Sequence, residues 1–264
     1  MLDLIQKWSR TSAQGLHYLD NQAEGEVYVL LHGISSGAQS WIKQFMALDN
    51  CRLIAWDAPG YGQSQPLATS TPNAEDYAAA LQHLLQELDI TQPIHLIGHS
   101  LGALIASGYA YHHAHALQRL VLVNPAQGYG FASADEQQRV YQMRPQLLKR
   151  LGQEGMARER GPRLLAQHTA FNLEVVAAVS QGLTQTGIEH ASYLFAYDSI
   201  ERYLARISVP TQLIYGEQDV ITPPKGMFEL QHKFPQLQLT PIPEAGHLAY
   251  LDQPDCFNRY VFQA

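Results

Sequence analysis

Short apolar segments rich in branched side chains alternate along this chain with segments that have helical spacing. Strand-like runs cover residues 27–31, 53–56, 94–97, 120–123 and 213–215, with a further candidate at 237–242. Each run is short enough to form a strand that is buried on both faces. This order predicts the α/β class, with a mostly parallel sheet covered by helices.

One of the covering helices has a clear apolar stripe. The stripe consists of Tyr77, Leu81, Leu84, Leu85 and Leu88, which fall on one face at helical spacing. Pro72 suits the first turn of such a helix because its ring presets the backbone and it needs no N–H there. We therefore expect a helix that begins near Pro72 and packs against the sheet.

The strand–helix alternation stops after Asn124. From 127 to 207 there is no strand-like run, and the helical stretches are interrupted at Gly152, Gly161, Pro162 and Gly187. This pattern predicts a helical cap at 127–207, inserted into a core domain formed by 1–126 and 208–264. The insertion holds 9 Lys and Arg against 8 Asp and Glu, whereas the whole chain carries a net charge of −7. A near-neutral lid over an acidic core favours a small, mainly apolar substrate.

Composition restricts the class of protein. A chain of 264 residues that is 46% hydrophobic and 16% charged can bury one large core. The negative net charge and the lack of like-charge runs disfavour nucleic acid and anionic membranes as partners. Neither an export signal nor an apolar span of eighteen residues is visible. We expect a cytoplasmic protein, a monomer or homodimer, that acts on a small-molecule substrate. Cys51 and Cys256 lie far apart and predict free thiols.

The segment 98–102, with the sequence Gly-His-Ser-Leu-Gly, lies between a predicted strand and a predicted helix. A sharp turn at this place crowds the backbone, and glycine on either side lets the neighbouring elements approach. Ser100 would then project its hydroxyl outward at the start of a helix, where free N–H groups stabilise negative charge. A simple helix N-cap is the alternative role for Ser100.

A serine hydroxyl is a weak nucleophile unless a base takes its proton and a third group orients that base. His247 follows the last predicted strand, and Asp219 follows the strand at 213–215. Active groups of open α/β sheets gather at the carboxyl ends of strands, where all three candidates lie. Asp252 and Asp57 are alternative acids.

These residues resemble the α/β-hydrolase superfamily, in which nucleophile, acid and histidine follow in this chain order. Residues 31–34 (Leu-His-Gly-Ile) resemble the family's oxyanion loop, and residues 57–64 (Asp-Ala-Pro-Gly-Tyr-Gly-Gln-Ser) resemble its D-x-P-G-x-G-x-S turn. The resemblance covers almost the whole chain. It implies the α/β-hydrolase fold, a mostly parallel sheet of the eight-stranded type that is flanked by helices and carries a cap.

The resemblance also implies roles for single residues. The backbone N–H groups of Ile34 and Leu101 would bind the tetrahedral oxyanion. Asp57 would belong to the turn motif. Some relatives carry the acid at the position of Asn124, which has no carboxylate here, so Asp219 is favoured as the acid.

The implied activity is that of a serine hydrolase that cleaves a small ester or lactone through an acyl-enzyme on Ser100. His247 would be the base and Asp219 the orienting acid, without metal or cofactor. Length, cap size and the loop at 33–38 are closest to carboxylesterases and enol-lactone hydrolases. Carbon–carbon bond hydrolases of ring-cleavage products are an alternative, although their usual Gly-Ser-Gly-Pro-Gly loop is absent. A small-molecule receptor with an intact triad but no turnover is another.

Several further residues have two interpretations. Ser35 and Ser36 contact the substrate or close a turn. Trp41 lines the substrate pocket or packs in the core with Phe45, one helical turn away. His32 shapes the oxyanion loop rather than titrating.

Two basic clusters complete the candidates. His112, His113 and His115 lie near a predicted helix end, and without accompanying Cys or carboxylate pairs they predict no metal site. Arg158, Arg160 and Arg163 of the cap clamp a carboxylate or form a solvated helix face.

Overall fold

The computed structural model describes residues 2–262, with side chains from Ile5 onward. Its centre is one eight-stranded sheet in the order β1-β2-β4-β3-β5-β6-β7-β8. The strands are β1 (Ser9–Thr11), β2 (His17–Asp20), β3 (Val27–Leu31), β4 (Arg52–Trp56), β5 (Ile94–His99), β6 (Leu117–Val123), β7 (Thr211–Gly216) and β8 (Gln238–Ile242). Only the pairings of β1 with β2 and of β2 with β4 are antiparallel. The predicted mostly parallel α/β sheet is confirmed.

All six predicted runs are strands, but β1 and β2 were not predicted. The sequence of β1 is Ser-Arg-Thr, which offers no apolar run. Strand β2 is fully buried although it begins with His17 and ends with Asp20. These polar side chains are paired with other buried or half-buried groups, His17 with Asp57 and Asp20 with Arg52. A reading based on hydrophobic pattern therefore misses this strand.

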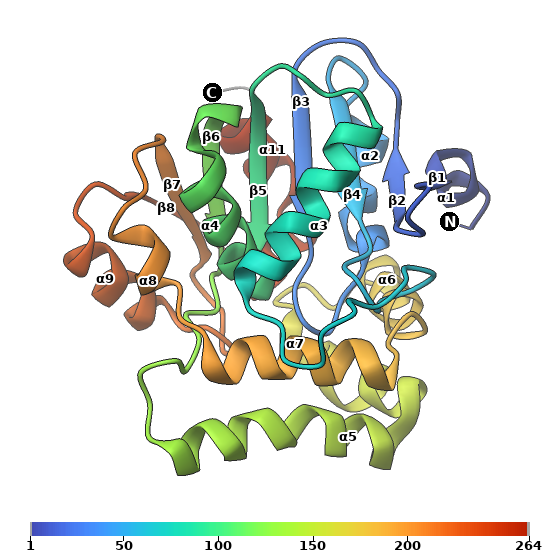
Figure 1. The fold of residues 1–264 in the computed structure, drawn as a ribbon. Coiled ribbons are helices and arrows are strands. Elements are labelled where there is room, and N and C mark those ends of the chain that lie inside the picture. Colours follow the sequence, from blue (N-terminus) through green and yellow to red (C-terminus); the bar gives the residue numbers. More distant parts are fainter. Residues whose placement is uncertain (1, 263–264) are drawn as a thin grey trace.

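Helices cover both faces of the sheet (Figure 1). On one face α3 (Ala74–Glu87), α4 (Leu101–His113) and α9 (Pro224–Lys233) enclose the first hydrophobic cluster. On the other face α1 (Leu2–Trp8), α2 (Ile42–Ala47), α10 (Ala249–Asp252) and α11 (Pro254–Phe262) enclose the second. Neighbouring strand residues divide between them, as Leu31 and Leu30 do, because side chains alternate across a sheet. The sheet is thereby buried between two layers of helices.

The predicted helix with the apolar stripe is α3, but its start was placed wrongly. Asn73 is the N-cap: its side chain accepts the N–H groups of Glu75 and Asp76, and the Asp76 carboxylate accepts the N–H of Asn73. This reciprocal capping box satisfies donors that are otherwise unpaired at a helix start. Pro72 therefore lies before the cap and not in the first turn.

Helices also make up most of the segment 127–207. They are α5 (Ala134–Arg160), α6 (Ala170–Ser180), α7 (Gln185–Tyr197) and α8 (Glu201–Leu204), and the segment contributes no strand to the sheet that the structure describes. Short 3-10 turns are η1 (Ala38–Trp41), η2 (Ala114–Ala116) and η3 (Gly161–Leu164). In Figure 1, α7 lies below the sheet and α5 lies beyond α7. Helices α5 and α7 thus face one end of the sheet, whereas α8 packs beside α4.

Two glycines of this segment act differently. Gly152 has φ 64° and ψ −179° and breaks the direction of α5, as predicted. Gly187 does not interrupt a helix, because it lies in the first turn of α7, which Thr184 caps. A Cβ at Gly187 would lie 2.3 Å from the Gly60 carbonyl oxygen, so α7 needs glycine there to approach the loop at 57–64.

None of the helices within residues 2–262 has both the length and the apolar character needed to cross a membrane. Cys51 and Cys256 are free thiols, as predicted.

Candidate active site

Ser100 occupies a strained turn between β5 and α4. Its backbone angles, φ 53° and ψ −115°, are sparsely populated by residues with a side chain and cost roughly 1–3 kcal/mol. The surrounding structure holds this geometry through hydrogen bonds from the Ser100 N–H to the Val123 carbonyl (2.9 Å) and from the Ala126 N–H to the Ser100 carbonyl (3.1 Å). Strain that is fixed in this way is typical of functional sites.

The two glycines beside Ser100 are sterically required. A Cβ at Gly98 would lie 2.3 Å from the Gly102 carbonyl oxygen. A Cβ at Gly102 would lie 2.4 Å from the carbonyl oxygen of Leu31. The start of α4 can therefore pack this closely against β5 and β3 only when both positions lack side chains.

His247 and Asp219 form a buried pair at the ends of β8 and β7. The Nδ1–H of His247 donates to Oδ2 of Asp219 at 2.8 Å, and the exposed fraction is 4% for the histidine and 3% for the aspartate. The bond fixes the tautomer that leaves Nε2 of His247 free to accept a proton. The structure thus brings these two sequence candidates into direct contact.

Asp219 receives four further hydrogen bonds. Its Oδ2 accepts from Asn124 Nδ2 (2.6 Å) and Thr222 Oγ1 (2.7 Å), and its Oδ1 accepts from the N–H groups of Ile221 (2.7 Å) and Thr222 (3.1 Å). Burial raises the pKa of this carboxyl, but hydrogen bonds and the nearby His247 outweigh burial, so the net pKa lies below the usual value. The acid stays ionised. Asn124, which sequence reasoning treated only as a missing acid, is a donor to it.

Ser100 and His247 line one pocket, which also includes Ile34 and Ser35. No hydrogen bond joins Ser100 Oγ to His247 among the residues described, and hydrogen bonds at enzyme active sites often form fully only when substrate is bound. The pocket has a volume of about 30 Å³, room for little more than water in this conformation.

His99, to which the sequence analysis assigned no role, holds the loop that carries His247. Its Nε2–H donates to the His247 carbonyl at 2.9 Å, and the two rings meet edge to face with centroids 4.7 Å apart. Burial, followed by the charge that His247 can carry, holds the pKa of His99 well below its usual range. A neutral His99 is thus a fixed donor that positions His247.

The loop after β3 is held by His32. Its Nδ1–H donates to the Gly33 carbonyl (2.8 Å) and its Nε2 accepts the N–H of Ala58 (2.9 Å). Acceptance at Nε2 requires the neutral ring, and burial lowers the pKa of His32. The Tyr61 hydroxyl donates to the Ile34 carbonyl at 2.8 Å. These contacts orient the peptide of Ile34 at the pocket, and Leu101 opens helix α4, where the first N–H groups have no partner within the helix.

The two residues predicted to bind substrate are placed differently. Ser35 lines the pocket, and its buried hydroxyl has no hydrogen-bond partner among the described residues. Trp41 is fully buried in the second hydrophobic cluster and stacks on Tyr250 with centroids 3.8 Å apart. Phe45 belongs to the same cluster. The core role, and not the pocket role, fits Trp41.

The alternative acids have other partners. Asp57 accepts from His17 Nδ1 (2.7 Å) and the Ala38 N–H (2.8 Å) in the predicted turn motif. Asp252 accepts backbone N–H groups from Gly246, Ala166 and Gln167 at 2.8 to 3.0 Å, which joins the loop before His247 to the segment after η3. Burial raises the pKa of Asp252 more than these bonds lower it.

Of the basic clusters, one contributes to the pocket. Arg160 lines it together with Arg144, which sequence reasoning did not single out, whereas the Arg158 side chain is 76% exposed. His112 lies 2.9 Å from a Glu75 carboxylate oxygen. Among the described residues, no three Cys, His, Asp or Glu side chains are grouped so that they could hold a metal.

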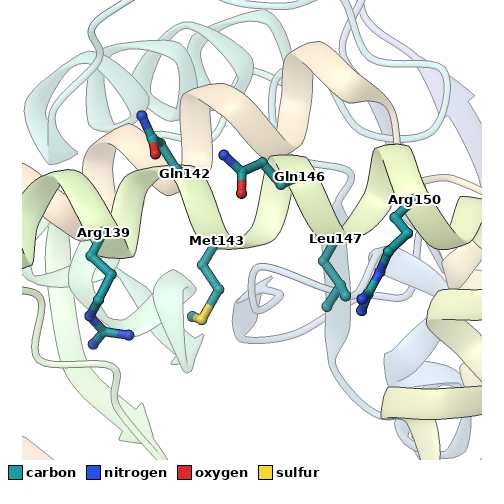
Figure 2. Close-up of a pocket in the computed structure, with 6 residues that line it drawn as sticks. All are labelled: Arg139, Gln142, Met143, Gln146, Leu147 and Arg150. Carbon is teal, nitrogen blue, oxygen red and sulfur yellow. The ribbon is translucent and has the colours of Figure 1, made fainter.

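A larger hollow lies on α5, outside this site (Figure 2). It is lined by Arg139, Gln142, Met143, Gln146, Leu147 and Arg150. All six come from one helix, and none is a nucleophile or a general base. The hollow therefore offers no hydrolytic chemistry.

Comparisons with known proteins identify the family. Residues 27–254 match the family described as alpha/beta hydrolase fold. A 2-hydroxy-6-oxononadienedioate/2-hydroxy-6-oxononatrienedioate hydrolase of Pseudomonas putida is 26% identical over 270 residues, which cover 93% of this chain and 90% of that protein.

Solved structures share the fold. A thermophilic esterase from Thermogutta terrifontis has a TM-score of 0.80 at 24% identity, covering 97% of this chain and 96% of the esterase. An enol-lactonase from Burkholderia xenovorans has a TM-score of 0.78 at 20% identity, covering 97% and 98%. The family match spans most of the chain and includes the strained serine turn and both partners of the His–Asp pair. The chain belongs to the α/β-hydrolase fold family.

Proposed function

We propose that the protein is a serine hydrolase in which Ser100 is the nucleophile, His247 the base and Asp219 the orienting acid. The main support is the buried His247–Asp219 hydrogen bond of 2.8 Å on the pocket that Ser100 also lines. An ionised acid with five donors fixes the imidazole and stabilises its cationic form, as a triad requires. An isolated N-cap serine would need none of these partners.

In the proposed reaction, Oγ of Ser100 attacks the substrate carbonyl carbon while Nε2 of His247 accepts the hydroxyl proton. The N–H groups of Ile34 and Leu101 stabilise the resulting oxyanion, each contributing about 3 kcal/mol. When the bond to the leaving group breaks, His247 returns the proton to that group. Water then attacks the acyl-serine while His247 takes its proton. When the bond between the acyl carbon and Ser100 Oγ breaks, His247 returns this proton to Oγ, which regenerates Ser100 and releases the acid product.

Residues 127–207 act as a cap over this site, and the remainder forms the core domain. Arg144, Arg160 and Leu164 of the segment line the pocket together with Ser100. Because the pocket holds only about 30 Å³, these side chains must move to admit a substrate. Small substrates are therefore favoured over polymers.

Two kinds of bond are candidates for cleavage. A small ester or lactone is the simplest substrate for an acyl-enzyme route and needs no group beyond the triad and the oxyanion donors. Hydrolysis of a carbon–carbon bond beside a ketone is the second, and it is supported by the sequence relative from Pseudomonas putida, whose named substrate is a 6-oxo dioate. Both begin at a carbonyl carbon.

Steady-state assays of wild type and Ser100→Ala on 4-nitrophenyl esters, small lactones and 2-hydroxy-6-oxononadienedioate test the proposal. We expect sustained turnover on at least one class and a loss of about 10⁴-fold or more in Ser100→Ala with unchanged circular dichroism. Equal activity of the variant and wild type would refute the assignment of Ser100 as the nucleophile. One slow acylation without turnover would instead indicate a receptor.

A further inference from the structure

Two arginines have no acidic partner on the helical side of the pocket, the side that is lined by residues of the segment 127–207. Arg144 and Arg160 both line the pocket with Ser100 and His247. Neither forms an ion pair with a carboxylate in the described part of the chain. Nε and Nη1 of Arg144 and Nε of Arg160 are buried without any hydrogen-bond partner. Buried polar groups in proteins are normally satisfied, so these donors call for an acceptor.

The lack of an acceptor is most unusual for Arg144, because this residue is buried. Arg144 is 8% exposed, and its guanidinium carbon lies 4.8 Å from the centre of the Phe195 ring, which attracts the cation but does not neutralise its charge. Burial, together with the like charge of Arg160, lowers the pKa of Arg144 to about 10. The side chain therefore stays cationic at neutral pH, and a buried cation without a counter-ion is costly.

The shape of α5 brings the two arginines together. In a straight helix, 16 residues would separate Arg144 from Arg160 by about 24 Å. The turn at Gly152, with φ 64°, lets both ends of the helix reach one small pocket. Nothing lies within 4 Å of the position of a Gly152 Cβ, so the backbone angle, and not space, requires glycine.

The pocket offers no acid of its own to these arginines. Its lining residues include no Asp or Glu, and the nearby Asp219 is saturated by five donors. Guanidinium groups present paired N–H donors that match a carboxylate. The missing acceptor is therefore expected on the ligand.

We infer that Arg144 and Arg160 bind a carboxylate of the substrate, so that the enzyme acts on small carbonyl compounds bearing a free acid group. This inference rests on the proposed function, because it names the substrate class of the same site. It replaces the expectation of a mainly apolar substrate.

Matched ester pairs test the inference. One pair is 4-nitrophenyl butyrate and mono-4-nitrophenyl succinate, with the acid on the acyl side. The other is phenyl acetate and 4-acetoxybenzoate, with the acid on the leaving group. We expect wild type to favour the acid member of at least one pair in kcat/KM. Arg144→Gln and Arg160→Gln should each lower that ratio by about ten- to a hundredfold, chiefly through KM.

Arg158→Gln is the control, because it removes an exposed arginine two residues from Arg160. It should leave the ratio unchanged. Arg144→Gln changes a buried residue and could impair folding. Arg160 is only half-buried, so Arg160→Gln tests the same inference with less risk to the fold. Wild type that does not favour the acid in either pair, or a ratio unchanged in both variants, would overturn the inference.

A binding measurement separates this inference from the proposed function. Titration of Ser100→Ala with succinate by calorimetry needs no turnover. We expect binding that Arg160→Gln weakens about tenfold or more in the same background, while Arg158→Gln does not. Binding without any wild-type hydrolysis would retain the anion site and refute the enzyme. Hydrolysis without such binding would support the enzyme and refute the anion site.

Discussion

The two sides of the pocket differ in how their polar groups are satisfied. On the sheet side, Asp219 accepts five hydrogen bonds and His247 is held at both Nδ1 and its carbonyl. On the helical side, Arg144 and Arg160 retain buried N–H groups with no partner. The His247–Asp219 pair is thus held without a ligand, whereas the two arginines find an acceptor only when a ligand supplies one.

This difference suggests separate functions for the two sides: the sheet side for the reaction and the helical side for the choice of substrate. A preorganised acid–base pair suits a fixed reaction, because catalytic groups that are already oriented need no rearrangement. Unsatisfied donors on α5, one on each side of its break at Gly152, suit a ligand that supplies the acceptor. We therefore expect changes on the sheet side to alter kcat and changes on the helical side to alter substrate preference.

The largest effect should come from Asp219→Asn. The amide would no longer hold the Nδ1–H tautomer of His247, and a loss of about 10⁴-fold in kcat is typical of this substitution in triads. Glu217→Gln, an exposed change in the same loop, is the control and should have little effect. Steady-state kinetics on the best substrate measure both. A loss below about tenfold would contradict the role of Asp219.

Asp219→Asn should also change the pH dependence of stability. The folded-state pKa of Asp219 is below 3.8, so its stabilising contribution is fully present above pH 3.8 and is lost as pH falls below that value. The difference in unfolding free energy between wild type and variant should shrink over that acid range. Denaturant unfolding at a series of pH values measures it, and a difference that grows on acidification would contradict the assignment.

Gly152→Ala should act on the helical side. A residue with a side chain is strained at φ 64° and ψ −179°, which costs about 1–3 kcal/mol or straightens α5 and separates the two arginines. We expect lower stability and a reduced preference for acid esters. Glu154→Ala, an exposed change two residues further along the chain, is the control. Unchanged stability and preference would show that the kink has no such role.

The smallest effect should come from Thr222→Val, which removes one donor to Asp219 while keeping the shape of the side chain. Loss of a single hydrogen bond of about 0.5–1.5 kcal/mol predicts a decrease of a few-fold in kcat. Thr222→Ser, which retains the hydroxyl, should remain close to wild type. If both variants behave alike, the hydroxyl bond of 2.7 Å does not matter for turnover.

Much of this arrangement was predictable from local sequence. The runs that became β3 to β8 are short and branched, and the candidates Ser100, Asp219 and His247 follow β5, β7 and β8 in the chain. Parallel strands bring their carboxyl ends to one edge, so residues 119 and 28 positions apart in sequence become neighbours. Periodicity and glycine spacing carry that information.

The remaining features depend on tertiary contacts. Strand β2 is buried through the pairs His17–Asp57 and Asp20–Arg52, which no apolar pattern reveals. Arg144 is an ordinary arginine in the sequence of a polar helix, and only the bend at Gly152 brings it to the same pocket as Arg160. The only local signal was Gly152 itself, which indicated a break but not its direction.

The most direct test of the proposed triad is covalent labelling with a small fluorophosphonate, followed by intact mass measurement and peptide mapping. This reagent reports an activated serine. We predict a single adduct on Ser100 in wild type and labelling that is slower by orders of magnitude in His247→Ala. Labelling of another residue, no adduct in wild type, or an equal rate in His247→Ala would contradict the assignment of Ser100 as a nucleophile activated by His247.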